Sequence, residues 1–276
     1  MYPDLIGALT CPTHPEAPLN LAPGSRHDAD GAIVRGALCC PVCGTRFAIR
    51  GGIPDLLGPR ELPTSPAQFA NALPLTAWGY ERFWRPYALS LLSGEPFGYE
   101  RELPLITGLA SPNRGGLIVD VACSNGLYAR ALERARGTAD GHVVGIDHAM
   151  PMLRQARAYA RAAGLRISFV RARAQALPVA SASLAAITMG GSLNEIGDVA
   201  GALRELRRAL APAGRVALMS LVRASTLPGR VLQAALGTGG IVFPPLDALN
   251  RACAAAGLRL RAQWRYGVVV FSLLTR

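Results

Sequence analysis

The segment Leu117-Ile-Val-Asp-Val-Ala-Cys-Ser-Asn-Gly126 is a short apolar run that leads directly into a turn of small residues. A second apolar run, Val143 to Ile146, ends in Asp147. In a doubly wound α/β domain, the turn after the first strand lets the backbone approach an adenine nucleotide, and an acid at the end of the second strand binds the ribose hydroxyls. The sequence therefore predicts a nucleotide site formed by these two segments.

The turn departs from the G-x-G-x-x-G pattern of dinucleotide sites. Ala122 and Ser124 stand where glycines are expected, and only Gly126 remains. A Cβ atom at such a place is tolerated only if the residue has a negative φ, so we expect φ below zero at Ala122 and Ser124. A tight turn in a domain that has lost its cofactor is the alternative reading of this stretch.

The composition is that of a globular protein, with 50% hydrophobic and 17% charged residues in a chain of 276. At about 150 residues per domain, this length predicts one large domain or two unequal ones. All 29 basic residues are arginine and the formal net charge is +11, with 21 arginines against 8 acids in residues 111–276. No apolar run reaches the ~18 residues that a membrane span needs, and the first residues do not form a signal-peptide pattern, so we expect a cytoplasmic protein.

Three regions differ in composition. Residues 1–60 are rich in Pro, Gly and Cys and predict a small β ribbon, and the Pro-rich segment that follows marks a boundary. Residues 61–110 form a linker and an aromatic-rich segment, in which we expect two short helices and a third across 98–109. Residues 111–276 alternate between β-like and helical runs.

This alternation predicts βαβ crossovers and a mainly parallel sheet. Only a short turn around Tyr266 and Gly267 separates the last two strands, which permits a hairpin but no crossover. The predicted fold is therefore α/β, a doubly wound, mainly parallel seven-stranded sheet with a C-terminal antiparallel hairpin, beside a small N-terminal ribbon. We expect strands at 117–121, 142–146, 167–171, 184–189, 214–221, 258–264 and 267–274, and helices at 126–136, 150–163, 199–210 and 245–256.

Four segments occur in an order typical of class I S-adenosylmethionine-dependent methyltransferases, and residues 115–276 resemble that family. The resemblance implies a Rossmann-like methyltransferase fold and S-adenosyl-L-methionine as cofactor. The segments are Asp120-Val-Ala-Cys-Ser-Asn-Gly126, Gly145-Ile-Asp147 with Met150-Pro-Met-Leu153, Ala174-Gln-Ala-Leu-Pro178, and Leu206-Arg-Arg-Ala-Leu-Ala-Pro-Ala-Gly214.

The resemblance also implies which residues bind the cofactor. Asp120 and the turn would face its methionine and ribose parts, Asp147 would bind the ribose hydroxyls, and His148 and Met152 would lie beside the adenine. Many family members bind the adenine amino group through an acid, but Arg173 stands there in this chain, so the adenine is expected to be held by backbone groups or by Gln175. The implied set is Asp120, Ala122, Cys123, Ser124, Asn125, Gly126, Asp147, His148, Met152, Arg173, Ala174, Gln175, Met189 and Gly190.

In the family, the segment Thr188 to Ile196 forms the wall beside the transferred methyl group. Methyl transfer is an in-line displacement that depends on positioning and exclusion of water, and it needs a base only if the acceptor must lose a proton. His148, Asn194 and Glu195 are the catalytic candidates, although Glu195 is equally consistent with a helix-start carboxylate. The region before the first strand caps the active site in this family, so we expect an apolar substrate pocket lined by Tyr80, Trp84 and Tyr87.

The N-terminal ribbon contains two pairs of potential metal ligands. Cys11-Pro-Thr-His14 and Cys40-Pro-Val-Cys43 each place two ligands on one knuckle, and together they complete a closed tetrahedral set for a structural zinc ion. The alternative is a metal-free cluster of loops. The ribbon resembles the small zinc-ribbon proteins that accompany methyltransferases. Cys123 and Cys253 are predicted to be packing residues rather than nucleophiles.

Three functions are consistent with the sequence. The first is methyl transfer to a small, hydrophobic or aromatic acceptor. The sequence predicts no membrane span, and it does not predict an oligomeric state. The second is a ribosomal RNA methyltransferase, in which Arg154, Arg157 and Arg161 would form one basic helix face that contacts phosphates. The plainer interpretation of these arginines is a solvated helix face. The third function is a degenerate, non-catalytic binding module.

Overall fold

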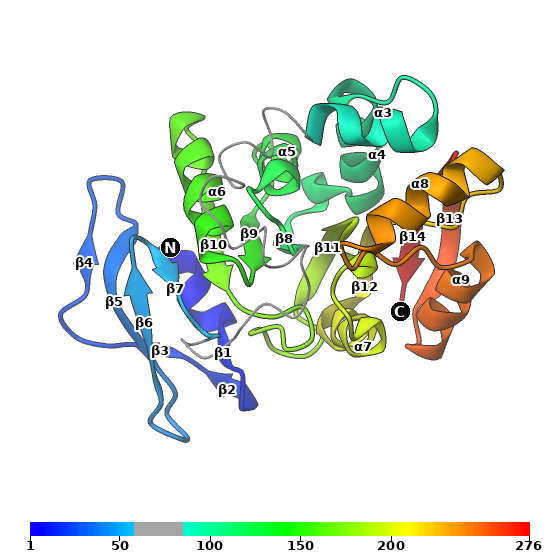
Figure 1. The fold of residues 1–276 in the computed structure, drawn as a ribbon. Helices are drawn as coiled ribbons and strands as arrows, with labels where there is room; N and C mark the ends of the chain where they lie inside the picture. Colours follow the sequence, from blue (N-terminus) through cyan, green and yellow to red (C-terminus); the bar gives the residue numbers. More distant parts are fainter. Residues whose placement is uncertain (58–84) are drawn as a thin grey trace.

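The computed structural model describes residues 1–57 and 85–276, and its centre is a seven-stranded sheet with helices on both faces (Figure 1). The strand order is β10-β9-β8-β11-β12-β14-β13. The first five strands run parallel, and β14 is antiparallel to its neighbours β12 and β13. The expected parallel sheet with a C-terminal hairpin is confirmed. The bounds are β8 (Gly116–Val121), β9 (Gly141–Asp147), β10 (Ile167–Arg171), β11 (Leu184–Gly190), β12 (Leu210–Leu221), β13 (Arg259–Tyr266) and β14 (Val269–Thr275).

The helices form two layers, one on each face of the sheet. Apolar residues of α3, α4, α5 and α6 share a core that includes Ile106, Leu132 and Leu153. The other face carries α7 and α9, whose Leu203 and Leu249 belong to a second core. None of the described helices is long and apolar enough to cross a membrane. The bounds are α3 (Arg85–Ser93), α4 (Tyr99–Ala110), α5 (Leu127–Arg136), α6 (Met150–Ala162), α7 (Val199–Ala209), α8 (Leu227–Gly237) and α9 (Leu246–Ala255).

Two elements differ from the sequence prediction. β12 begins at Leu210, because Leu210 pairs with Leu184 of β11 before the ladder shifts register. α8 was not predicted at all, since its first turn contains Pro228 and Gly229. Proline fits at this position because the first turn needs no backbone donor there, and the Thr226 side chain accepts a hydrogen bond from the Gly229 backbone.

The N-terminal region forms small antiparallel sheets that pack on the second face of the central sheet. Residues 172–183, which connect β10 to β11, form no helix, and the N-terminal residues occupy that place. The Thr10 backbone donates to the carbonyl of Pro178 at 2.9 Å, and Leu5, Leu9 and Leu38 belong to the second core. The elements are η1 (Pro3–Ala8), β1 (Thr10–Cys11), β2 (His14–Pro18), β3 (Asn20–Leu21), β4 (Arg26–His27), β5 (Ile33–Cys39), β6 (Arg46–Arg50) and β7 (Ile53–Pro54).

The N-terminal sheet also covers the edge of the central sheet. Asp55, which follows β7, forms a parallel bridge with Arg171 of β10, and the Leu56 backbone donates to the Arg171 carbonyl at 2.9 Å. An uncovered edge strand offers unpaired backbone groups to other chains. The N-terminal region therefore completes the central domain along this edge.

Ion pairs hold the two parts together, and they use the arginines of α6. Asp28 lies 3.1 Å from Arg161 and 3.6 Å from Arg157. The predicted basic helix face is therefore largely paired inside the protein, and only Arg154 of the three arginines has no ion pair among the described residues. Further pairs of the same kind join Asp30 to Arg161, Asp4 to Arg166 and Asp55 to Arg171.

A buried histidine lies at the same junction. Ser168 of β10 accepts a hydrogen bond from the Tyr2 backbone at 2.9 Å, and its hydroxyl lies 2.8 Å from Nε2 of His142. The hydroxyl proton of Ser168 can therefore be donated to a neutral His142. Burial lowers the pKa of His142 to about 4, against the partly opposing effect of Asp4.

We expect His142 to make stability depend on pH. Its folded pKa lies below its unfolded value near 6.5, so the stability it supports is complete above pH 6.5 and is lost as the pH falls toward 4. Between pH 7.5 and 5 the histidine should cost about 2 kcal/mol of unfolding free energy. His142→Gln keeps an acceptor but does not titrate, so urea unfolding should show a flatter pH profile for the variant. Parallel profiles for the two proteins would contradict this assignment.

Candidate functional site

The predicted nucleotide segments meet at one edge of the central sheet. β9, β8 and β11 are neighbours, and their carboxyl ends carry Asp147, the turn 122–126 and the segment after Gly190. Ligands of open α/β sheets bind at this edge, where loops and helix starts converge. The structure therefore brings together residues that lie up to 70 positions apart in the sequence.

The turn 122–126 has a backbone that the sequence analysis did not predict. Ala122 has a φ of 53° and Ser124 a φ of 50°, so the expectation of negative values was wrong. A left-handed conformation costs a residue with a Cβ about 1–2 kcal/mol, and surrounding contacts must hold it. Here the Cys123 backbone donates to the Ile146 carbonyl at 3.0 Å, and the Gly126 backbone donates to the Cys123 carbonyl at 2.8 Å.

A side chain at Gly126 would be both strained and tightly packed. Its φ is 75°, and a Cβ atom there would lie 3.0 Å from both the Ala156 side chain and the Phe169 ring. The turn therefore passes close to α6 and β10 at this point. Cys123 is buried in the same region, and burial raises the pKa of its thiol. Burial also raises the pKa of Cys253 to about 11, so neither thiol suits a nucleophile.

Asp147 connects the turn to the start of α6. Its carboxylate accepts hydrogen bonds from the backbone of Ser124 and of Ala149, both at 2.8 Å. A carboxylate has about four acceptor positions, so these two bonds leave room for two ligand hydroxyls. The side chain is nearly buried, with 7% of it exposed, and it lies at the edge where the ribose was expected.

Asp120, the residue expected to face the cofactor, is hydrogen-bonded within the protein. One of its carboxylate oxygens accepts from the Ala129 backbone at 3.0 Å, and the other accepts from the Thr188 hydroxyl at 2.8 Å. Burial, with a smaller contribution from the nearby charge of Asp147, raises the pKa of Asp120 to about 7. Asp120 thus anchors the first turn of α5 to β8 and β11, and its oxygens point into the protein.

Two buried nitrogen atoms at this edge have no hydrogen-bond partner within the described parts of the chain. They are Nδ2 of Asn125 and Nε2 of His148. Nδ1 of His148 lies 3.5 Å from the Asp147 carboxylate, so the ring stands beside that acid. A buried polar group without a partner is costly, and a ligand with matching polar atoms would satisfy these two.

Of the residues expected around the adenine, some contact one another or neighbouring backbone groups, and others are exposed. The Ser124 hydroxyl lies 3.6 Å from the sulfur of Met152, which is buried at the start of α6. Gln175 donates through Nε2 to the carbonyls of Ile196 and Asp198, at 3.2 and 3.4 Å, and this leaves its amide oxygen as an acceptor. Arg173 is exposed, and Ala174 lies half-buried beside it.

Two of the three catalytic candidates, Asn194 and Glu195, lie in the segment after β11, and their surroundings differ. Both amide hydrogens of Asn194 are used, by the carbonyls of Leu221 and Val242, and its oxygen accepts from the Leu221 backbone at 2.9 Å. Asn194 therefore positions the end of β12 and has no amide hydrogen left for an acceptor. Glu195 is half-buried, and burial, with a contribution from Asp147, raises its pKa, which suits a general base.

A buried pair that the sequence did not reveal lies behind Gly190. Tyr128 of α5 forms a short hydrogen bond with Glu102 of α4, and both side chains are buried. A Cβ atom at Gly190 would lie 2.6 Å from the Tyr128 ring, so glycine is required there, next to the buried Met189. The only signal in the sequence was the two adjacent glycines at the end of β11, Gly190 and Gly191.

The predicted substrate residues are mostly untested by the structure. Tyr80 and Trp84 lie outside the described residues. Tyr87 belongs to α3, and its side chain is 70% exposed, which counts against its lining an enclosed pocket.

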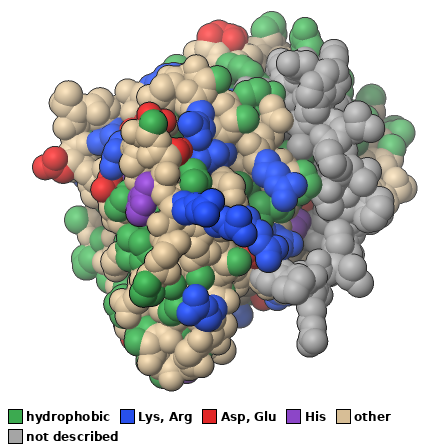
Figure 2. All heavy atoms as spheres, turned by 90° about the vertical axis from the view of Figure 1, so that its left-hand side faces the viewer, with side chains coloured by type: hydrophobic (Ala, Val, Ile, Leu, Met, Phe, Trp, Pro, Cys, Tyr) green, Lys and Arg blue, Asp and Glu red, His purple; other side chains and the backbone are tan. Residues whose placement is uncertain are grey.

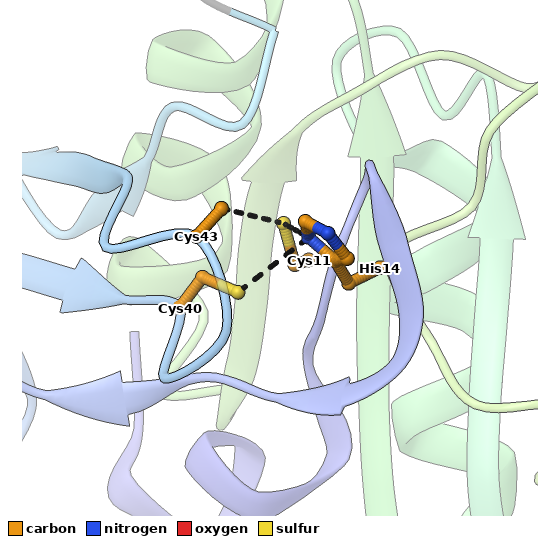
Figure 3. A group of neighbouring side chains, drawn as sticks. All are labelled: Cys11, His14, Cys40 and Cys43. Carbon is orange, nitrogen blue, oxygen red and sulfur yellow. Dashed lines mark hydrogen bonds between the residues drawn. The ribbon is translucent and has the colours of Figure 1, made fainter.

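The four predicted metal ligands converge in the N-terminal region (Figure 3). The sulfur of Cys11 lies 3.7 Å from Nδ1 of His14 and 4.0 Å from the sulfur of Cys43, and Nδ1 also lies 3.9 Å from the sulfur of Cys40. All four ligand atoms lie within 4.8 Å of one another. A tetrahedral zinc ion separates two sulfurs by about 3.8 Å and a sulfur from a nitrogen by about 3.5 Å, so the donor set and its spacing fit this metal.

Comparison with known proteins agrees with this geometry. Residues 118–214 match the family model described as a methyltransferase domain. A demethylmenaquinone methyltransferase of Thermus thermophilus is 42% identical over 103 residues, which cover 37% of this chain and 46% of that protein. An uncharacterized chloroplastic methyltransferase of Arabidopsis thaliana is 29% identical over 195 residues, covering 66% and 53% of the two chains.

The structural match extends further along the chain. The fold is similar to that of a SAM-dependent methyltransferase from Aquifex aeolicus, with a TM-score of 0.56 and 18% identity over 73% of this chain and 97% of that one. The chain spans about half the length of the curated relatives described above. The sequence of residues 118–214 is that of a methyltransferase domain, and the fold is that of a class I S-adenosylmethionine-dependent methyltransferase.

Proposed function

We propose that this chain binds S-adenosyl-L-methionine at the edge formed by β8, β9 and β11, and transfers its methyl group to a small, hydrophobic, quinone-like ring. One observation carries the proposal. The Asp147 carboxylate and the two unpartnered nitrogens, on Asn125 and His148, lie within the segments 122–126 and 147–149, where the family binds its cofactor.

The residues match the polar groups of this cofactor. Asp147 has acceptor positions left for the two ribose hydroxyls. Nδ2 of Asn125 is a donor suited to an acceptor on the cofactor, and the oxygen of Gln175 is an acceptor suited to the adenine amino group. The Met152 side chain offers an apolar surface for the adenine ring.

When bound, the cofactor supplies a methyl group on a positively charged sulfur. A ring hydroxyl must lose its proton before a hydroquinone-like acceptor becomes a good nucleophile, and Glu195 is the carboxylate that would take this proton. After the ring carbon accepts the methyl group, its hydrogen would move to the ring oxygen to restore the hydroquinone, and Glu195 would release its proton to solvent. Burial keeps the pKa of Glu195 above its usual range, so it is a stronger base than an exposed glutamate. Asn194 would hold Glu195 in place by fixing the adjoining backbone to β12.

Apolar surface near Glu195 supports a hydrophobic acceptor. The Val242 backbone exchanges hydrogen bonds with Asn194, and its side chain is 64% exposed. Further along the chain, α8 also carries the exposed apolar side chains of Leu227 and Val231. The Thermus relative is named for a demethylmenaquinone substrate, which is an aromatic quinone with an apolar tail. The RNA alternative has less support, because Arg157 and Arg161 are engaged by Asp28.

Cofactor binding can be tested by calorimetry with S-adenosylmethionine and S-adenosylhomocysteine. Asp147→Asn should weaken both ligands at least about thirtyfold, because charged hydrogen bonds to the ribose are lost. The same change should also lower the melting temperature by a few degrees, since the amide cannot accept from both backbone groups. Asp4→Asn is the matched control, because Asp4 pairs with Arg166 just before β10, at the opposite end of that strand from this edge, and its loss should leave the affinity unchanged. Unchanged affinity in Asp147→Asn would sink the proposed site.

The acceptor class can be tested with radiolabelled methyl donor. We expect transfer to a reduced 1,4-naphthoquinone carrying an isoprenoid tail, and at least tenfold less turnover in Glu195→Gln with the cofactor affinity retained. Ribosomal RNA offered in parallel should remain unlabelled. Labelling of RNA but not of the naphthohydroquinone would overturn the proposed acceptor while leaving the cofactor site intact.

The Cys11, His14, Cys40 and Cys43 cluster is proposed to hold a structural zinc ion, because three thiolates and one imidazole form a closed set with no position for a substrate. We expect one zinc per chain by elemental analysis. Cys43→Ser should lose the metal and unfold at a lower temperature. Cys39→Ser is the matched control, since Cys39 lies next to the cluster but outside it, and should keep the metal. A full zinc content in Cys43→Ser would contradict this ligand set.

A further inference from the structure

The charges of the N-terminal region are separated onto two sides. Residues 1–57 contain five acids and four arginines. Four of the acids form ion pairs with arginines of α6 and β10 or of the segment between them, and the fifth, Glu16, accepts a hydrogen bond from Ser181 at 3.0 Å. All five acids therefore face the methyltransferase domain.

The four arginines lie on the opposite, outward side. Arg26, Arg35 and Arg50 are direct neighbours across β4, β5 and β6, since Arg35 pairs with both of the others in the sheet register. Arg46 lies on the same face of β6 and pairs with Cys39. All four side chains are exposed, and none has an ion pair within the described parts of the chain. Figure 2 shows basic side chains gathered across this side of the molecule.

This arrangement is unfavourable for the protein alone. Like charges that lie directly opposite each other on a sheet repel, and neighbouring strands are only about 4.8 Å apart. The positions between the arginines are filled by Ala37 and Ala48, which are too small to shield the guanidinium groups. An anionic surface placed against this face would remove the repulsion.

We propose that this arginine face, formed by Arg26, Arg35, Arg46 and Arg50, docks the protein on an anionic lipid membrane. An apolar side chain at the end of the face favours a membrane over other polyanions. Val42, at the tip of the Cys40 to Cys43 knuckle and close to Arg46 in the chain, has a side chain that is 64% exposed. Basic residues beside an exposed apolar tip are typical of surfaces that bind at the lipid interface.

The same face lacks what single-stranded RNA requires. Such sites combine a basic groove with aromatic rings on which bases stack. The only Phe, Tyr or Trp residues in 1–57 are Tyr2 and Phe47. The Tyr2 ring lies 4.4 Å from the Arg166 guanidinium, and Phe47 packs against the second core, so neither is available on the arginine face.

The test is sedimentation of the full chain with vesicles, and it is independent of any methyl acceptor. We expect binding to phosphatidylglycerol-containing vesicles, weak binding to pure phosphatidylcholine, and loss of binding at high salt. Each basic residue near the surface contributes about fivefold, so Arg35→Glu with Arg50→Glu should weaken binding at least about twentyfold. Val42→Ser should also weaken it, without changing the charge.

The matched control is Arg134→Glu with Arg204→Glu, on α5 and α7, which changes the net charge equally and also replaces exposed arginines. The control should retain binding within about threefold. Equal losses in both double variants would overturn the proposal, because net charge alone would then explain binding. Binding of duplex RNA without binding of the anionic vesicles would also overturn it. The milder variant Arg35→Gln with Arg50→Gln should also weaken vesicle binding. Unchanged cofactor affinity in the variants would show that they are folded, so that a loss of vesicle binding is not a result of misfolding.

Discussion

The Asp147 carboxylate holds together the two segments from which the nucleotide edge is built. It accepts from the Ser124 backbone on one side and from the Ala149 backbone on the other. The first bond fixes a turn in which Ala122 and Ser124 both have a positive φ, at a cost of about 1–2 kcal/mol each. The second bond places a negative charge at the start of α6, where the helix dipole favours it. The shape of the edge therefore depends on one acid before any ligand is bound.

The two acids at this edge, Asp120 and Asp147, have different roles. Asp120 uses both oxygens inside the protein, and burial together with the charge of Asp147 raises its pKa to about 7. Near neutral pH Asp120 is thus partly protonated, so the edge does not carry two full negative charges. Groups whose environments differ in this way take different roles. Asp120 anchors α5, and Asp147 keeps acceptor positions toward the ligand.

The sequence was sufficient to predict the sheet and the cluster of three cysteines and one histidine, because both depend on local patterns. Apolar runs with helical spacers predict parallel strands, and two knuckles with fixed spacing predict the convergence of Cys11 and His14 with Cys40 and Cys43. The roles of single polar residues were less predictable. Asn194 is of a residue type that can act in catalysis. In the structure, both of its amide hydrogens bind backbone carbonyls of residues 27 and 48 positions away in the sequence, Leu221 and Val242. The sequence did not predict α8 because its first turn contains proline and glycine, which usually indicate a turn or loop.

The N-terminal region is best understood as part of the catalytic domain rather than as an appended cover. It supplies apolar residues such as Leu5 and Leu9 to the core where the connection from β10 to β11 has no helix, and its β7 covers the edge strand. A ribbon that only packed against the domain would not need all its acids on the inner side and all its arginines on the outer side. Because every acid of the ribbon faces inward, the arginines left on its outer side have no internal partner to neutralise them. The ion pairs that attach the ribbon to the domain therefore also give the molecule its basic outer face.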